Sequence, residues 1–252
     1  MIFLELRKLR QRVERLEKRV ERLVEGRPPL VEERVKTFVA GFDDALGGGI
    51  PRGHVVIIHG PAGTMKTSLA LYIASRNEEE GMTPLYISLE ESKESLQKTM
   101  ASLGIKGKDF IVDIATMRLE HGLVEEIDDW FPILKSYLQN KVREGIDLLV
   151  IDSLNSLYPA IRSNSPRGEL FRFFSFLRDS RITSFLVYEG MEFHYREEHM
   201  VDGLIEITPR ELEGGQMPLW MRCVKLRLSD HSRDYHRLEF RRGRFMTLPV
   251  NR

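Results

Sequence analysis

Short apolar runs alternate with amphipathic stretches over most of the chain. The runs are rich in Val, Ile and Leu, which favours buried strands, and the stretches between them have helical spacing. This alternation predicts an α/β fold with a mostly parallel sheet and right-handed crossovers. We expect strands at 55–58, 85–89, 110–114, 146–153 and 183–189, and helices at 68–74, 93–103, 123–143 and 170–180.

The last fifty residues have a different character. Their apolar segments follow one another without helical stretches between them, which indicates successive strands at 202–207, 221–228, 238–240 and 245–248. The last two flank Arg241-Arg242-Gly243-Arg244, a sequence typical of a hairpin turn. We therefore expect a β-rich C-terminal extension of the parallel core.

Apolar residues recur at steps of four and three over residues 2–25, which predicts a coiled-coil helix. Val13 and Val20 fall at heptad position a, and Leu9, Leu16 and Leu23 at position d, an arrangement that favours two parallel strands. A single amphipathic helix lying on its own domain is the alternative. Residues 26–29 (Gly-Arg-Pro-Pro) end the helix, so we expect a coiled coil at 1–27 and a domain at 28–252.

Composition narrows the class of protein. The chain has 252 residues, of which 42% are hydrophobic, enough for a packed core. Lys plus Arg and Asp plus Glu both total 38, so the overall charge does not point to a polyanionic partner. A single cysteine, Cys223, excludes an internal disulfide. No apolar run reaches the roughly 18 residues of a membrane span and we find no signal peptide, so we expect a cytoplasmic protein.

The most specific motif is Gly60-Pro61-Ala62-Gly63-Thr64-Met65-Lys66-Thr67. It lies between an apolar strand and a helix, which is the context of a phosphate-binding P-loop. Backbone N–H groups would hold an anion, Lys66 would reach the β- and γ-phosphates, and the Thr67 hydroxyl would ligate Mg²⁺. The alternative is an ordinary Gly-rich turn.

One position departs from the P-loop pattern. Met65 stands where the last Gly is expected. We expect Met65 to take helical dihedrals at the start of the helix, which would keep the phosphate cradle.

Carboxylates follow two of the predicted strands. Glu90 and Glu91 come after the strand at 85–89, on the sheet edge where the P-loop lies. One of them could activate a water near the γ-phosphate, or both could simply form an acidic helix start. Asp152 closes the strand at 146–153 in the Walker-B form, in which the carboxylate holds Mg²⁺ through water or through Thr67.

Two cations lie in the strand expected at 221–228. Lys225 and Arg227 share one face of it by the two-residue period. They could form a solvated strand face, or they could reach a phosphate on a neighbouring subunit.

Taken together, these motifs resemble the RecA-like ATPases and, within them, the KaiC-like family. The match covers residues 37 to about 240, most of the chain. Besides the P-loop it includes F-D-D-A-L-G-G-G-I-P-R-G at 42–53, S-L-E-E-S at 88–92, L-L-V-I-D-S-L at 148–154, Y-E at 188–189, V-D-G-L-I-E-I at 201–207 and V-K-L-R-L-S-D-H at 224–231.

The resemblance implies a RecA-like P-loop NTPase core that binds ATP and Mg²⁺ between subunits of a ring, commonly a hexamer. It implies catalytic roles for Glu90, Glu91, Lys66, Lys225 and Arg227, the last two acting on the neighbouring subunit's ATP. It implies nucleotide binding by Gly60, Ala62, Gly63, Thr64, Met65, Lys66, Thr67, Ser68 and His231, and metal binding by Thr67 and Asp152.

Two departures limit the resemblance. Residues 196–200 read R-E-E-H-M, where the clock protein of this family carries a Ser-Thr phosphoacceptor pair, so its autophosphorylation is not carried over. The chain also holds one copy of the domain, where that protein has two.

The leading hypothesis is a slowly hydrolysing ATP-dependent switch that forms a homo-oligomeric ring and signals to an unknown protein partner. A RecA-like recombination accessory protein that binds DNA is the first alternative, since loops 158–167 and 190–200 contain Arg162, Arg167 and Arg196. Glutamates in the second loop oppose a nucleic-acid partner. A non-hydrolysing scaffold that keeps a nucleotide is the other alternative.

Overall fold

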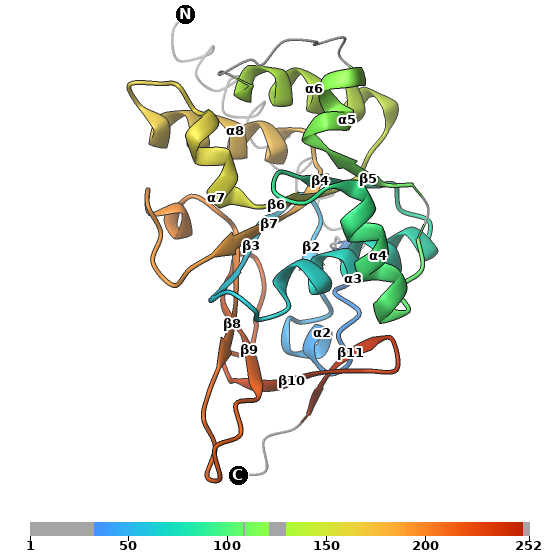
Figure 1. Cartoon of the computed structure of the whole chain (residues 1–252). Helices are drawn as coiled ribbons and strands as arrows, with labels where there is room; N and C mark the ends of the chain where they lie inside the picture. The colour runs from blue at the N-terminus through green and yellow to red at the C-terminus, as the bar shows by residue number, and fades with distance from the viewer. Residues whose placement is uncertain (1–32, 108, 121–129, 249–252) are drawn as a thin grey trace, which may run out of the picture. The chain divides into compact units, whose positions relative to one another are not determined.

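A computed structural model describes residues 33–107, 109–120 and 130–248 of the chain. Its described residues contain a central sheet in the strand order β11-β10-β9-β8-β3-β7-β6-β4-β5 (Figure 1). These strands are β3 (Val55–Gly60), β4 (Pro84–Ser88), β5 (Ile111–Asp113), β6 (Leu148–Asp152), β7 (Thr183–Glu189), β8 (Gly203–Pro209), β9 (Leu219–Leu226), β10 (His236–Arg241) and β11 (Arg244–Leu248). A small antiparallel pair, β1 (Arg34–Val35) and β2 (Ile50–Pro51), precedes it.

The sheet has a parallel half and an antiparallel half. Strands β8, β3, β7, β6, β4 and β5 pair in parallel, and every residue of β3, β4 and β6 is buried. Strands β9, β10 and β11 continue the sheet in antiparallel fashion. The α/β fold, the mostly parallel sheet and the β-rich C-terminal region are thus confirmed.

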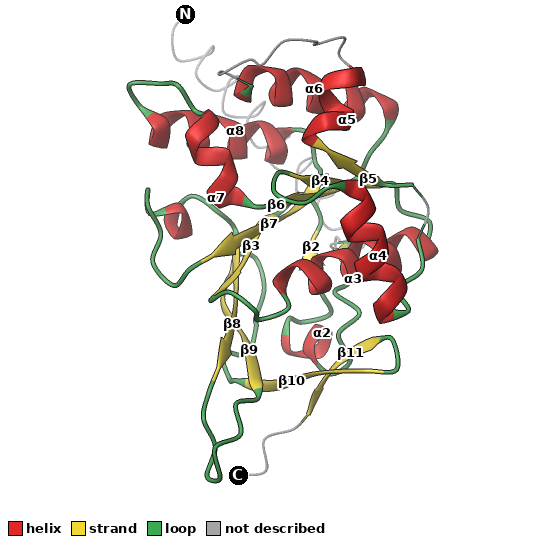
Figure 2. Cartoon of the chain, in the orientation of Figure 1, coloured by secondary structure: helices red, strands yellow, loops and turns green. Residues whose placement is uncertain are grey.

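Helices cover both faces of the parallel half (Figure 2). On one face α3 (Lys66–Glu79) and α4 (Lys93–Leu103) pack on the even-numbered residues of β3, such as Val56 and Ile58. On the other face α6 (Phe131–Glu144), α7 (Leu154–Leu157) and α8 (Pro166–Asp179) pack on Val55 and Ile57. The remaining helical segments are α2 (Phe42–Ala45), α5 (Ile114–Glu120), η1 (Tyr158–Ala160) and η2 (Glu197–His199).

Local signals explain where α4 begins and ends. The Ser92 hydroxyl accepts a hydrogen bond from the backbone N–H of Ser95, which satisfies a free donor at the helix start. Gly104 follows the helix with a φ of 66°, a left-handed conformation that glycine adopts without strain. The expected helix at 93–103 is therefore confirmed.

Other predicted boundaries were wrong. The strand expected at 221–228 runs from Leu219 to Leu226, so Arg227 lies in the following turn. The helix expected at 170–180 already begins at Pro166, whose missing N–H is tolerated in a first helical turn. Ile114 begins α5 instead of ending a strand.

Three predictions fall wholly or partly outside the described residues. The coiled coil at 2–25 and the domain boundary at residue 27 lie there entirely, and the helix expected at 123–143 is described only from residue 130 onward. No helix of the described residues is both long and apolar enough to cross a membrane.

Candidate functional site

The loop between β3 and α3 depends on a glycine at Gly60. A side chain there would overlap the carbonyl oxygen of Ile207 on the neighbouring strand β8. On its other side, the Gly60 carbonyl accepts a hydrogen bond from the N–H of Gly190 at 3.0 Å. The end of β3 is thus enclosed by backbone from both neighbouring strands.

The residue before α3 takes an unexpected conformation. Met65 has φ 63° and ψ 23°, which is left-handed, so our expectation of helical dihedrals was wrong. A non-glycine residue in this conformation costs roughly 1–2 kcal/mol, which explains why P-loops usually have glycine here. The loop nevertheless keeps its turn, because the partly buried Met65 side chain packs against the core.

A cavity of about 200 Å³ lies at the carboxyl ends of the parallel strands. In a parallel α/β sheet this edge is where ligands bind. Residues from four strand ends contribute to the cavity, so the topology collects groups that are far apart in the sequence. Its lining consists of Gly63, Thr64, Met65, Lys66, Thr67, Glu90, Asp152, Ser153, Val187 and Glu189.

The Lys66 ammonium group lies inside the loop that precedes it. Its Nζ donates to the Pro61 carbonyl oxygen at 2.7 Å, and the side chain is almost fully buried. Burial lowers the pKa of Lys66, while the carboxylates of Glu189, Asp152 and Glu90 oppose that effect. Lys66 is thus a cation held at the cavity wall by a single strong backbone contact, which a phosphate oxygen could replace.

A buried tyrosine anchors Asp152 at the cavity. Its Oδ2 accepts a 2.5 Å hydrogen bond from the fully buried Tyr86 hydroxyl. Burial raises the pKa of Asp152, and hydrogen bonds from Tyr86 and from the Thr67 side chain oppose this. The peptide bond from Asp152 to Ser153 is cis.

The acidic and hydroxyl groups of this cavity fit Mg²⁺ with a phosphate ligand. Thr67 and Asp152 supply one hydroxyl and one carboxylate, and the described residues contain no cluster of three or more His, Cys, Asp or Glu side chains able to cage a metal. Mg²⁺ is usually held by one or two carboxylates together with substrate phosphates and water. The residues present therefore fit Mg²⁺ bound with a nucleotide.

Glu90 and Glu91 face different surroundings. Oε1 of Glu90 accepts hydrogen bonds from the hydroxyls of Ser153 and Ser156, the latter at 2.9 Å, and Glu90 lines the cavity. Oε2 of Glu91 accepts from the Ser95 hydroxyl at 2.7 Å in the first turn of α4. Glu91 is thus part of the helix start, while Glu90 faces the cavity.

The sequence reasoning missed several groups at this cavity. Glu189 ends β7, and the Asn155 side chain holds its backbone by bonds of 2.7 and 2.9 Å. An acidic residue at the end of an apolar strand could have indicated Glu189. The Tyr86 and Ser153 contacts had no such signal, since they arise only when β4 and β6 pair.

The nucleotide-binding residues expected at 60–68 all lie at the end of β3, on this loop or in the first turn of α3, whereas Lys225, Arg227 and His231 do not. Leu226 pairs with Gly203 at the amino-terminal end of β8, the opposite sheet edge from the cavity. The six residues of β3 separate the two edges by roughly 20 Å.

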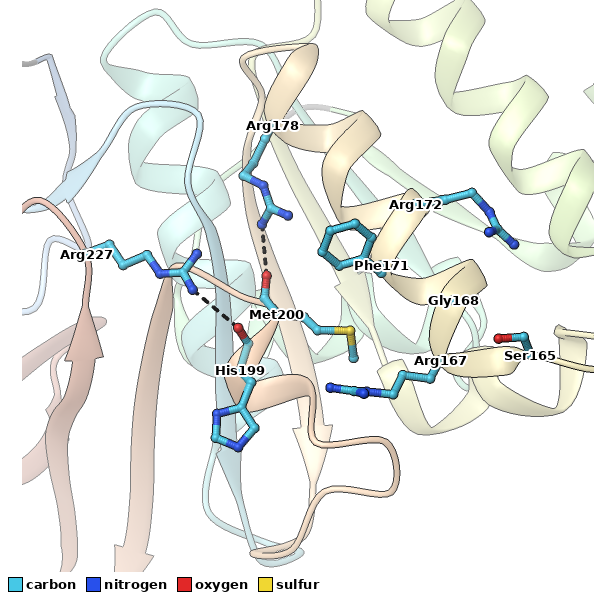
Figure 3. Close-up of a pocket in the computed structure, with 9 residues that line it drawn as sticks. All are labelled: Ser165, Arg167, Gly168, Phe171, Arg172, Arg178, His199, Met200 and Arg227. Atoms are coloured by element: carbon cyan, nitrogen blue, oxygen red, sulfur yellow. Dashed lines mark hydrogen bonds between the residues drawn. The ribbon is translucent and has the colours of Figure 1, made fainter.

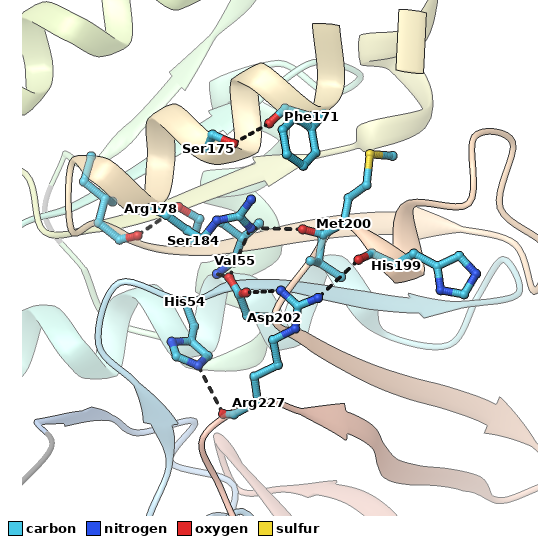
Figure 4. Close-up of polar contacts among 12 residues, drawn as sticks. His54, Val55, Phe171, Ser175, Arg178, Ser184, His199, Met200, Asp202 and Arg227 are labelled. Atoms are coloured by element: carbon cyan, nitrogen blue, oxygen red, sulfur yellow. Dashed lines mark hydrogen bonds and ion pairs between the residues drawn. The ribbon is translucent and has the colours of Figure 1, made fainter. Parts of the chain in front are cut away.

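At that opposite edge the two cations contact one segment, and Figure 4 shows the contacts of Arg227 with Asp202 and His199. Lys225 Nζ donates to the carbonyl oxygens of Glu198 and Val201 at 2.9 and 2.6 Å. Burial and the nearby guanidinium of Arg227 lower the pKa of Lys225. Arg227 pairs with Asp202 at 3.0 Å. The prediction that Lys225 and Arg227 share a strand face was wrong, because Arg227 lies in the turn after β9. Both side chains nevertheless contact residues 198–202.

His231 lies beyond this turn. Its Nδ1 is 3.2 Å from the carbonyl oxygen of Ser229, and its Nε2 is buried without a hydrogen-bond partner. The Ser229 hydroxyl donates to the Leu46 carbonyl oxygen at 2.7 Å, which ties this turn to the segment after α2.

A β-strand, Gly-rich loop and Lys-Thr helix on a mostly parallel sheet, with carboxylates at the neighbouring strand ends, define a RecA-like P-loop NTPase. A family model described as "ATPase: KaiC" matches residues 35–246. The chain therefore belongs to the KaiC family of ATPases.

Individual relatives agree with this assignment. A UPF0273 protein of Thermotoga maritima is 30% identical over 226 residues, covering 82% of this chain and 92% of that protein. The circadian clock protein KaiC2 of Synechocystis is 25% identical, and the match covers 85% of this chain but only 40% of KaiC2. A solved KaiC-like protein of Pyrococcus horikoshii shares the fold with a TM-score of 0.73 and 24% identity, covering 86% of this chain and 99% of that one.

The contact between Tyr86 and Asp152 gives a testable prediction. Tyr86→Phe keeps the buried ring but removes the donor to a carboxyl group, which should lower the free energy of unfolding by about 1.5–3 kcal/mol. Tyr72→Phe is the matched control, since its hydroxyl donates to the neutral Phe38 carbonyl and should cost about 0.5–1.5 kcal/mol. Denaturant unfolding measures both, and equal losses would contradict a charged partner for Tyr86.

Proposed function

We propose that this protein binds ATP with Mg²⁺, hydrolyses it slowly, and assembles into a homo-oligomeric ring in which nucleotide state acts as a switch. The observation that carries the proposal is the convergence of Lys66, Thr67, Glu90 and Asp152 on one cavity beside the P-loop. The KaiC-family membership of the chain supports the same function.

Each group has a distinct role in this proposal. Backbone N–H groups of the loop and of the start of α3 bind phosphate oxygens, and the helix dipole favours their negative charge. Lys66 exchanges its Pro61 contact for the β- and γ-phosphates. Thr67 and Asp152 hold Mg²⁺, which neutralises the charge that develops on the phosphates.

Glu90 is the proposed base that orients a water molecule and accepts its proton. Both of its described hydrogen bonds, from Ser153 and Ser156, are made to Oε1. These two hydroxyl donors hold the carboxylate in place at the wall of the cavity. A carboxylate positioned in this way can accept the proton of a water molecule beside the γ-phosphate.

The edge opposite the cavity supports a head-to-tail assembly. Lys225 and Arg227 cannot reach the chain's own P-loop across the length of β3. If the cavity edge of a second copy lay against this edge, its P-loop would face these cations. A head-to-tail contact of this kind closes into a ring when the rotation between copies permits. His231 follows the same turn, and we assign it to the neighbour's nucleotide as well. The number of subunits we propose, six, follows the family resemblance.

Loss of the Lys66 ammonium group tests ATP binding. Lys66→Ala should weaken Mg·ATP binding by about tenfold to 100-fold, because it removes a charged hydrogen-bond donor at the phosphates. Lys98→Ala is the control, since that lysine is 76% exposed on α4. Calorimetric titration with Mg·ATP measures both variants. Unchanged affinity in Lys66→Ala would remove the basis for the P-loop assignment.

A second test compares the two adjacent glutamates. Glu90→Gln should lower ATP hydrolysis by roughly 10²-fold while ATP still binds, because the amide cannot accept the proton of the attacking water. Glu91→Gln should have a smaller effect, since that side chain bonds the Ser95 hydroxyl in the first turn of α4. Steady-state phosphate release at saturating Mg·ATP is the measurement. Small and equal losses in both variants would mean that the pair serves only the helix start.

Mixing two inactive variants tests the role of the opposite edge. Arg227→Ala and Glu90→Gln should each hydrolyse ATP poorly, but mixed rings contain interfaces where an intact Glu90 meets an intact Arg227. Part of the activity should therefore return, since the cation acts from outside the binding subunit. The control mixes Arg227→Ala with the double variant Arg227→Ala/Glu90→Gln, because no interface in that mixture has an intact Arg227. Subunit exchange, shown by native mass spectrometry, without recovered hydrolysis would disprove the trans assignment.

A further inference from the structure

A second, larger pocket lies away from the nucleotide cavity. It has a volume of about 530 Å³ and lies along α8, from Arg167 in the first turn to Arg178 in the last, beside the end of η2 and the turn after β9 (Figure 3). Arg167, Arg178 and Arg227 point towards His199 and Met200, whereas Arg172 points away along α8. We call this the arginine pocket.

The arginine pocket carries more positive than negative charge. Asp202 is shared by Arg178 and Arg227, and the guanidinium of Arg167 donates to the Tyr195 carbonyl oxygen at 3.1 Å. Two of these three cations share the single charge of Asp202, and Arg167 bonds an uncharged carbonyl oxygen, so the pocket keeps a net positive charge. Glu169, on the same helix as Arg167, is already paired with Lys135 and Arg172.

An apolar side chain completes this surface. The Phe171 ring is 54% exposed and lies beside Met200 at the pocket (Figure 3). An exposed aromatic ring between guanidinium groups fits a partner that brings both a carboxylate and an apolar side chain.

The chain itself contains a segment with that chemistry. Residues 210–218 connect β8 and β9 as a hairpin that extends beyond the sheet (Figure 1). Backbone bonds from Arg210 to Pro218 and from Leu212 to Gln216 hold its shape. We call it the acidic hairpin because its exposed residues include Glu211 and Glu213, next to Met217, which is 56% exposed.

Arg210, the basic residue of the acidic hairpin, contacts Tyr235. The guanidinium of Arg210 lies over the Tyr235 ring at 3.3 Å from its centre, which places this cation at the base of the hairpin. The tip therefore presents two carboxylates and a methionine.

Within one chain the acidic hairpin lies far from the end of the pocket that holds Met200, Arg178 and Arg227. The acidic hairpin leaves the carboxyl end of β8, while the arginine pocket contains Met200 and Arg227 at the amino end of the same strand. The seven residues of β8 span roughly 23 Å. Complementary surfaces at opposite edges are the arrangement that a head-to-tail contact between copies requires.

We propose that the acidic hairpin of one copy docks in the arginine pocket of the next, with Glu211 or Glu213 facing Arg167 and Arg178 and Met217 packing on Phe171. This proposal deepens the assembly part of the proposed function, and it uses the same pair of edges. The hairpin lies on β8, next to the P-loop strand, so the contact would bring a neighbour's nucleotide towards Arg227.

Charge reversal tests the contact. Arg167→Glu and the double variant Glu211→Lys/Glu213→Lys should each raise the protein concentration needed for assembly with Mg·ATP by about tenfold or more, because like charges then meet. An equal mixture of the two should regain assembly, since half of its possible interfaces have opposite charges again. Arg143→Glu, an exposed arginine on α6, is the matched control and should assemble normally. Light scattering measures the mass of each.

Cross-linking gives a second measurement that does not depend on charge. Phe171→Cys/Met217→Cys should form covalent oligomers with a short bifunctional maleimide, while each single variant should stay mainly monomeric. The native Cys223 is buried, so it should not react. If the double variant formed no covalent oligomers, the proposal would be overturned.

The outcomes separate this proposal from the proposed function. A wild-type chain that binds Mg·ATP but stays monomeric would overturn the docking and leave ATP binding intact. Assembly and cross-linking without ATP binding would support the docking and overturn the proposed function. If Arg167→Glu weakened assembly and the hairpin reversal did not, another acidic segment would occupy the pocket and our choice of the hairpin would be wrong.

Discussion

The parallel pairing of β3 with β7 on one side and β8 on the other is the constraint on which the rest of the structure depends. It aligns the carboxyl ends of the strands, so that residues from β3, β4, β6 and β7 reach one cavity. It also encloses the end of β3 so closely that a Cβ at Gly60 would overlap the backbone of β8. Because β9 returns antiparallel to β8, the same register carries Lys225 and Arg227 to the opposite edge. One set of strand pairs thus creates both surfaces of the proposed assembly.

The phosphate-binding loop is maintained against its own local preferences. Met65 is left-handed and Lys66 is buried with a lowered pKa, and each of these is unfavourable in isolation. Both are held by their surroundings, since Met65 packs on the core and Lys66 bonds to Pro61. A loop held in this way needs little rearrangement when a phosphate binds, which is the physical advantage of a preorganised site.

The sequence predicts the parallel core and the P-loop well, because buried strands and Gly-rich loops are encoded by neighbouring residues. It does not predict where β9 ends, since Val224 to Leu228 keep strand-like residues while the pairing with β8 stops at Leu226. Nor does it predict the Tyr86–Asp152 bond or the arginine pocket, which join residues distant in the sequence. Glu90 and Glu91 look alike in sequence, and only their hydroxyl partners distinguish them.

Two arginines bind Asp202, so Arg227 can turn away without leaving this buried carboxylate unpaired. The Asp202 side chain is only 7% exposed, and an unpaired carboxylate at such a depth would cost several kcal/mol. Its Oδ1 accepts from Arg227, but Oδ2 accepts independently from Arg178 and from the Val55 N–H (Figure 4). If Arg227 turned to a neighbour's phosphate, Asp202 would keep two donors and remain neutralised. Arg178 would then be more firmly engaged with Asp202, leaving Arg167 as the less committed cation of the arginine pocket. In the proposed ring, nucleotide binding at one interface and hairpin docking beside it would therefore share a single buried carboxylate.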